Sequence, residues 1–153
     1  MRNTTTMLVL ANGCFDLFHV GHARYLKSAR QMGSSLCVAV TDDAHVNKGD
    51  GRPLYDQYER LEVVRAVRWV LDARVFANVI EAFEHYKPAI FAKGREYEHR
   101  IEREHEDYCK AHGIEIRFTD TETVRPRDRL RSKDLTDEEL DRKYSDPSLD
   151  RYC

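Results

Sequence analysis

The sequence predicts an α/β fold, a doubly wound parallel sheet of five strands in the order 3-2-1-4-5 with helices on both faces. Short continuous apolar runs, typical of strands buried on both faces, occur at residues 7–11, 36–40 and 89–92. Segments with apolar residues at helical spacing lie between these runs. A strand, a helix and a second strand fit within residues 7–40, which suits a βαβ unit with a right-handed crossover.

Start and stop signals place the remaining elements. Asp56 and Glu59 form a capping box in front of a helical segment, and Asn78 can cap the next helix. The residues expected to end helices are Gly33, Pro88 and Gly113. The expected strands are residues 7–11, 36–40, 69–71, 89–92 and 114–118, the last with the alternation of an edge strand. The expected helices are residues 19–32, 56–67, 79–86 and 98–112.

The composition excludes some classes of partner. The 153 residues carry a formal net charge of −2, so no overall basic field favours nucleic acid or an anionic membrane. The four cysteines show no C-x-x-C spacing, and the sequence has no signal-peptide pattern and no apolar run of transmembrane length. We therefore expect one reduced, soluble, cytoplasmic domain with no nucleic-acid or membrane partner, in which any anion site is local.

Residues 12–22 join the first strand to the first helix. A strand that turns through glycine into a helix presents free backbone N–H groups and the positive end of the helix dipole. His19 and His22 are three residues apart and share one helix face, and Gly21 allows a ligand close to the backbone. This stretch predicts a phosphate site. The alternative is that one histidine caps the helix and the other is an ordinary surface residue.

The motif Gly13-Cys14-Phe15-Asp16-x-x-His19-x-Gly21-His22 resembles the signature of the cytidylyltransferase-like nucleotidyltransferase superfamily. Within it, the sequence up to residue 118 is similar to the heptose-1-phosphate adenylyltransferase branch. The segments that carry this similarity are residues 12–17, 38–43, 48–53, 60–61 and 93–97. The resemblance implies a Rossmann-like catalytic domain over residues 1–124, a charged helix or tail over residues 125–153 that is not a separate domain, and a homodimer.

The resemblance also implies a reaction. A nucleoside monophosphate, AMP in preference to CMP, would pass from ATP or CTP to a sugar or polyol phosphate with release of pyrophosphate, and Mg2+ would bridge the triphosphate. The implied catalytic residues are His19, His22 and Lys48. The implied nucleotide-binding residues are Asn12, Gly13, Cys14, Phe15, Asp16, Gly21, Arg60, Lys93, Gly94, Glu96, Thr121 and Thr123.

Several alternatives stay open for these residues and for the function. Asp16 either binds Mg2+ or simply orients the turn. Without the family match, Lys48 and Arg60 would be interpreted as solvated surface residues. The protein is a nucleotidyltransferase for a sugar or polyol phosphate, a cytidylyltransferase for glycerol phosphate or choline phosphate, or a nucleotide-binding module with weakened catalysis.

The possibility of weakened catalysis arises from the sequence at the end of the expected core. The family has a Ser-Thr-Thr phosphate-binding turn there, and residues 118–126 contain no clean equivalent, although Thr121 and Thr123 offer hydroxyls. The basic residues between Arg125 and Lys133 form either a solvated helix or an arm that reaches over the phosphates or into a partner subunit.

Overall fold

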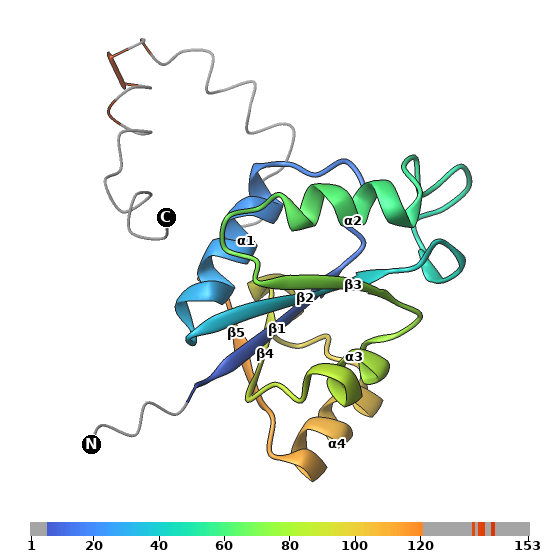
Figure 1. Cartoon of the computed structure of the whole chain (residues 1–153), viewed down its shortest axis with the longest axis vertical. Coiled ribbons are helices and arrows are strands. Elements are labelled where there is room, and N and C mark those ends of the chain that lie inside the picture. Colours follow the sequence, from blue (N-terminus) through green and yellow to red (C-terminus); the bar gives the residue numbers. More distant parts are fainter. Residues whose placement is uncertain (1–5, 121–135, 137, 140–141, 143–153) are drawn as a thin grey trace. The chain divides into compact units, whose positions relative to one another are not determined.

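A computed structural model describes residues 6–120 and, beyond them, residues 136, 138–139 and 142. Five parallel strands form one sheet in the order β3-β2-β1-β4-β5 (Figure 1). The strands are β1 (Leu8–Gly13), β2 (Ser35–Thr41), β3 (Asp72–Phe76), β4 (Ile90–Lys93) and β5 (Glu115–Phe118). The helices are α1 (Val20–Gln31), α2 (Gln57–Arg65), α3 (Val79–Tyr86) and α4 (Arg103–His112). The predicted fold class and strand order are therefore confirmed.

A hydrophobic core lies on each face of the sheet. Along β1, Val9 and Ala11 belong to the core that includes α1 and α2, whereas Leu10 belongs to the core that includes α3 and α4. Figure 1 shows the same division, with α1 and α2 on one side of the sheet and α3 and α4 on the other. Because both faces are covered, the central strands are continuous apolar runs rather than alternating ones.

β1 is the central strand, and its carboxyl end sets the position of the site. It pairs with β2, where Gly13 is opposite Val40, and with β4, where Ala11 is opposite Ala92. The chain moves from β1 toward one edge of the sheet and returns to add β4 on the other side, so the strand order reverses between β1 and β4. Open α/β sheets bind ligands at the carboxyl ends of the strands at such a switch point.

The predicted helix starts at Asp56 and Asn78 are confirmed. Asp56 accepts hydrogen bonds from the backbone N–H groups of Tyr58 and Glu59, and the Glu59 carboxylate accepts one from the Asp56 N–H. Asn78 accepts a hydrogen bond from the Glu81 N–H at the start of α3. These caps satisfy backbone donors that have no partner within the helix.

The predicted third strand at residues 69–71 is wrong. Val70 N donates to Val67 O in a turn, and β3 begins only at Asp72. Trp69 and Val70 pack against the core from this turn, which explains why the segment is apolar. An apolar run of three residues does not distinguish a strand from a buried turn.

The start of one helix differs from the expectation. α4 begins at Arg103 rather than near residue 98, because residues 95–97 form a separate 3₁₀ turn. Gly113 ends α4 with a φ of 70°, as expected. Gly33 follows α1 without a positive φ; a Cβ there would collide with the Met7 carbonyl oxygen, so close packing requires this glycine.

The predictions for the carboxyl-terminal region lie almost entirely outside the described residues. They concern Thr121, Thr123 and the charged tail over residues 125–153. Within that tail, Thr136 and Glu139 hydrogen-bond to each other as residues of a helix start do. The helices in the described part of the chain are all too short or too polar to cross a bilayer.

Candidate functional site

The turn between β1 and α1 has an unusual backbone. Phe15 and Leu17 both adopt a φ of 55°, in the left-handed region that residues other than glycine seldom enter. The Phe15 side chain is buried in the core on the α1 side of the sheet. Strain of this kind persists only where the surrounding packing enforces it, and it concentrates at functional sites.

His19 and His22 cap the start of α1 reciprocally. His19 Nδ1 accepts from Gly21 N at 3.0 Å, and His22 Nδ1 accepts from His19 N at 3.2 Å. The two rings stack with their centroids 4.0 Å apart. Because each Nδ1 is an acceptor, the neutral rings carry their protons on Nε2, away from the capped backbone. Capping therefore involves both histidines, and this tautomer places an N–H on Nε2 of each ring at the end of the helix where the dipole favours an anion.

The environment of His22 keeps its ring neutral. Burial, and then the charges of His19 and Lys48, lower the pKa of His22 from 6.5 to about 4. The rings of Phe15 and Phe18 each have their centroids 5.4 Å from that of His22. His22 is thus a neutral hydrogen-bond donor at pH 7. Lys48 is exposed on its loop, yet it lies close enough to influence this ring.

Asn12 and Lys93 meet at the switch point between β1 and β4. Lys93 Nζ donates to Asn12 Oδ1 at 3.0 Å and lies 4.2 Å from the centroid of the Tyr97 ring. Burial lowers the pKa of Lys93 from 10.5 to about 8, against the opposing effect of Glu96 and Glu102. The carboxyl edge of the sheet, where folds of this kind bind ligands, therefore holds a cation.

Tyr25, on α1, supports this arrangement and was missed by the sequence analysis. Its hydroxyl donates to Ala92 O at 2.6 Å and accepts from Asn12 N at 3.3 Å. A tyrosine on an amphipathic helix gives no signal of this role, because the pattern predicts only packing. On the same edge, a Cβ on Gly94 would collide with the Glu96 carboxylate, so glycine allows that side chain to fold back over the backbone.

The Asp16 carboxylate is buried and accepts hydrogen bonds on both oxygens. Oδ2 accepts from Arg52 Nε at 2.7 Å and from Leu54 N at 2.9 Å, and Oδ1 accepts from Tyr55 N at 3.2 Å. Burial alone would raise the pKa of Asp16, but the bonds from Leu54, Arg52 and Tyr55 outweigh it and lower the pKa to about 2. These contacts support the turn-orienting alternative and do not fit a Mg2+ ligand. Across the described residues, no group of three or more His, Cys, Asp or Glu side chains is arranged to hold a metal ion.

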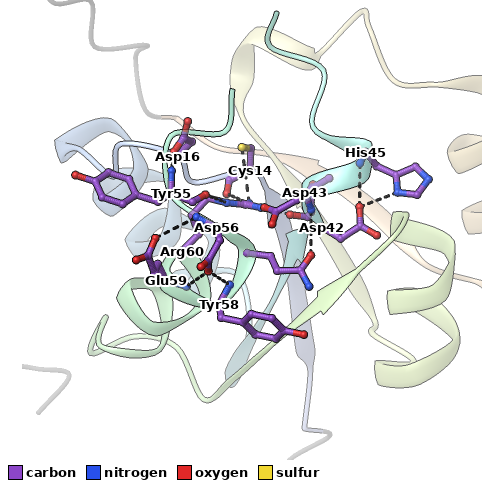
Figure 2. A network of polar contacts seen from close by, with 12 residues as sticks. Cys14, Asp16, Asp42, Asp43, His45, Tyr55, Asp56, Tyr58, Glu59 and Arg60 are labelled. Carbon is purple, nitrogen blue, oxygen red and sulfur yellow. Dashed lines mark hydrogen bonds and ion pairs between the residues drawn. The ribbon is translucent and has the colours of Figure 1, made fainter. Parts of the chain in front are cut away.

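The side chain of Arg60 is buried within the protein instead of facing a phosphate site. Its side chain is 1% exposed and donates to Cys14 O at 2.7 Å, to Thr41 O at 2.8 Å and to Tyr55 O at 3.0 Å. It also forms an ion pair with Asp43 at 2.8 Å. Figure 2 shows Arg60 among three of these partners, Cys14, Asp43 and Tyr55. The geometry therefore does not support the expected phosphate contact, and Arg60 joins three separate segments of the chain instead.

Residues 10–136 match the family described as cytidylyltransferase-like. The chain belongs to this cytidylyltransferase-like family. The match includes both groups of side chains at the carboxyl edge, the histidine pair and the Asn12–Lys93 pair. It confirms the superfamily that the signature motif resembles.

Relatives of this family member include proteins named bifunctional protein HldE. The chain is 38% identical to the one from Alkalilimnicola ehrlichii over 124 residues, which cover 74% of this chain and 24% of that protein. It is 40% identical to the one from Azotobacter vinelandii over 118 residues, which cover 72% of this chain and 24% of that protein. The chain therefore spans about a quarter of the length of these relatives. The relatives that this chain resembles are therefore HldE proteins, over the part of their length that it covers.

Solved structures of other proteins share this cytidylyltransferase-like fold. The lipopolysaccharide core biosynthesis protein from Thermoplasma volcanium superposes with a TM-score of 0.66 at 25% identity, covering 77% of this chain and 99% of that chain. Pantothenate synthetase from Thermus thermophilus superposes with a TM-score of 0.59 at 15% identity, covering 86% of this chain and 63% of that chain. The second likeness shows a common fold only.

Proposed function

We propose that this cytidylyltransferase-like protein transfers a nucleoside monophosphate, AMP in preference to CMP, from a nucleoside triphosphate to a sugar or polyol phosphate and releases pyrophosphate. The observation that carries the proposal is the stacked His19–His22 pair, whose Nε2–H groups are donors at the amino end of α1. Membership of the family supports nucleotidyl transfer. Similarity to HldE proteins and to a protein of lipopolysaccharide core biosynthesis supports AMP and a sugar phosphate.

The reaction needs positioning more than proton transfer. An acceptor phosphate oxygen attacks the α-phosphorus, a new P–O bond forms, and the bond to the bridging oxygen of pyrophosphate breaks. Since the attacking oxygen is already anionic, no strong general base is required. His22, whose pKa is lowered to about 4, remains a neutral donor that can stabilise charge on the α-phosphoryl oxygens without titrating near pH 7. Lys48 would add a positive charge beside it.

The Asn12–Lys93 pair would also bind the nucleotide. It lies at the switch point, where the fold places its ligands, and Lys93 keeps two further N–H groups besides the one that bonds to Asn12. This supports the nucleotide-binding role that the family resemblance implies for both residues.

We also propose that the reaction uses Mg2+ and that the protein forms a homodimer. Bound Mg2+ would neutralise triphosphate charge. The engaged carboxylate of Asp16 favours a metal held by phosphate oxygens and water, so we assign no step to it. The homodimer stays a prediction from the family resemblance.

The test is pyrophosphate release in the presence of Mg2+, measured for each nucleoside triphosphate with a panel of sugar phosphates, glycerol phosphate and choline phosphate. We expect release with ATP and a sugar or polyol phosphate. Release only with CTP and glycerol or choline phosphate would support the cytidylyltransferase alternative. Nucleotide binding without release for any acceptor would contradict the proposal and support the binding module.

A further inference from the structure

We infer that Asp16 and Arg60 are positioning residues, two buried charges of opposite sign that hold both ends of the Lys48 loop, residues 44–51, beside the histidine pair. Neither residue would touch the substrate. The inference rests on the proposed function only for its effect on turnover, because its effect on the ring of His22 can be measured without a reaction.

Arg60 fixes the start of the Lys48 loop. Its guanidinium bonds to Thr41 O at the end of β2 and forms the ion pair with Asp43, the first residue of the 3₁₀ turn that follows. Asp43 N donates to Gln57 Oε1 at 3.1 Å, so α2 contacts this residue a second time. The entry to the loop is therefore attached to α2 by both a backbone and a side-chain contact.

Asp16 fixes the end of the same loop. It accepts hydrogen bonds from Arg52 and from the backbone of Leu54 and Tyr55. Arg60 also contacts Tyr55. The backbone N–H of Tyr55 donates to Asp16, and its carbonyl oxygen accepts from Arg60. Both buried charges therefore bind the segment at residues 52–55.

A glycine turn connects residues 52–55 to Lys48. Arg52 N donates to Gly49 O at 3.3 Å, and Gly49 and Gly51 have φ values of 94° and 74°. Lys48 immediately precedes this turn. A displacement of Arg52 would therefore move the turn and, with it, the lysine.

The burial of both charges indicates a holding role. Asp16 is 3% exposed and Arg60 is 1% exposed. A buried charge is costly unless hydrogen bonds and opposite charges compensate it, and here the compensating groups belong almost entirely to the segments around the loop. Arg60 also binds Cys14 O, so the loop is attached to the signature turn itself (Figure 2).

The experiment follows the titration of His22 by NMR, since the charge of Lys48 is one cause of its low pKa. Lys48→Gln should raise this pKa. Asp16→Asn and Arg52→Gln should raise it as well, by a comparable amount, because the lysine then moves away. In the Lys48→Gln background, Arg52→Gln should have a much smaller effect. Arg52 is partly exposed, so its replacement keeps the test valid if Asp16→Asn does not fold.

Arg74→Gln is the matched control, because Arg74 forms a similar arginine–aspartate pair on β3 with Asp72. It should leave the pKa of His22 unchanged. An unchanged pKa in the folded Arg52→Gln variant, or an equal shift with and without Lys48, would overturn the inference. If the proposed function holds, Arg52→Gln should also lower kcat by about 10- to 100-fold with little change in the KM for nucleotide.

Discussion

His19 and His22 each use Nδ1 to cap the backbone at the start of α1, and their rings stack at 4.0 Å. This relationship determines the chemistry of the pair, because it assigns the proton of each neutral ring to Nε2. Each histidine therefore has two roles, one for each ring nitrogen, and a replacement by alanine removes both. The capping role concerns stability, and the Nε2–H role concerns the bound phosphate.

Replacing His19 by asparagine or alanine separates these roles. Asparagine is a good N-cap residue and can replace Nδ1 as an acceptor, but it does not reach the position of Nε2. We expect His19→Asn to keep the stability of the wild type and to lower kcat by about 10²–10³-fold. His19→Ala should lose the same activity and about 1 kcal/mol of unfolding free energy as well. Thermal unfolding and pyrophosphate release measure the two effects, and a fully active His19→Asn variant would exclude the catalytic role.

The low pKa of His22 predicts a dependence of stability on pH. Between pH 6.5 and about pH 4 the unfolded chain binds a proton at His22 that the folded protein does not bind. The free energy of unfolding should therefore fall as the pH drops through this range. Urea unfolding at several pH values should show this trend, and a smaller one in His22→Asn. A pH dependence equally steep in that variant would show that His22 is not its source.

The fold could be predicted because local patterns and packing agree almost everywhere. The strands at Val9–Ala11 and Leu36–Val40 are buried on both faces, and the caps at Asp56 and Asn78 mark real helix starts. The failure at residues 69–71 has a specific cause. Trp69 and Val70 are apolar because they cover the core from a turn, and no periodicity distinguishes that from a short strand.

The site was only partly predictable, for a related reason. The spacing of His19 and His22 indicated an anion site, but the role of Asp16 depends on contacts with residues 36 to 39 positions away. The sequence did contain a signal for the burial of Arg60. Arg60 lies four residues before Val64, on the buried stripe of α2, where an arginine must have internal partners.

Asp16 should contribute to stability in a pH-dependent way. Its pKa is lowered from 3.8 to about 2 in the folded state, so its contribution is complete above pH 3.8 and is lost as the pH falls toward 2. Asp16→Asn should destabilise the protein by about 1–3 kcal/mol at pH 7, because the buried donors of Arg52, Leu54 and Tyr55 lose a charged acceptor. The difference from the wild type should shrink between pH 4 and pH 2. Denaturant titrations that show a constant difference would contradict this account of the carboxylate.

Lys93 should make nucleotide affinity depend on pH. Burial lowers its pKa to about 8, so its charge is progressively lost as the pH rises through that value. We expect the Kd for a nucleoside triphosphate to increase over this range in the wild type. Lys93→Met should bind weakly at every pH and lack this dependence, whereas Lys110→Met, at an exposed position on α4, should behave like the wild type. Calorimetric titration measures each Kd.

The most direct test of the account is pyrophosphate release from ATP with a sugar phosphate by the double variant His19→Asn/His22→Asn. Both asparagines can keep the reciprocal cap, so the fold and its unfolding temperature should be retained. We expect the wild type to release pyrophosphate and the double variant to lose nearly all of this activity. Undiminished release by a correctly folded double variant would contradict the claim that the histidine pair stabilises the transferred phosphoryl group.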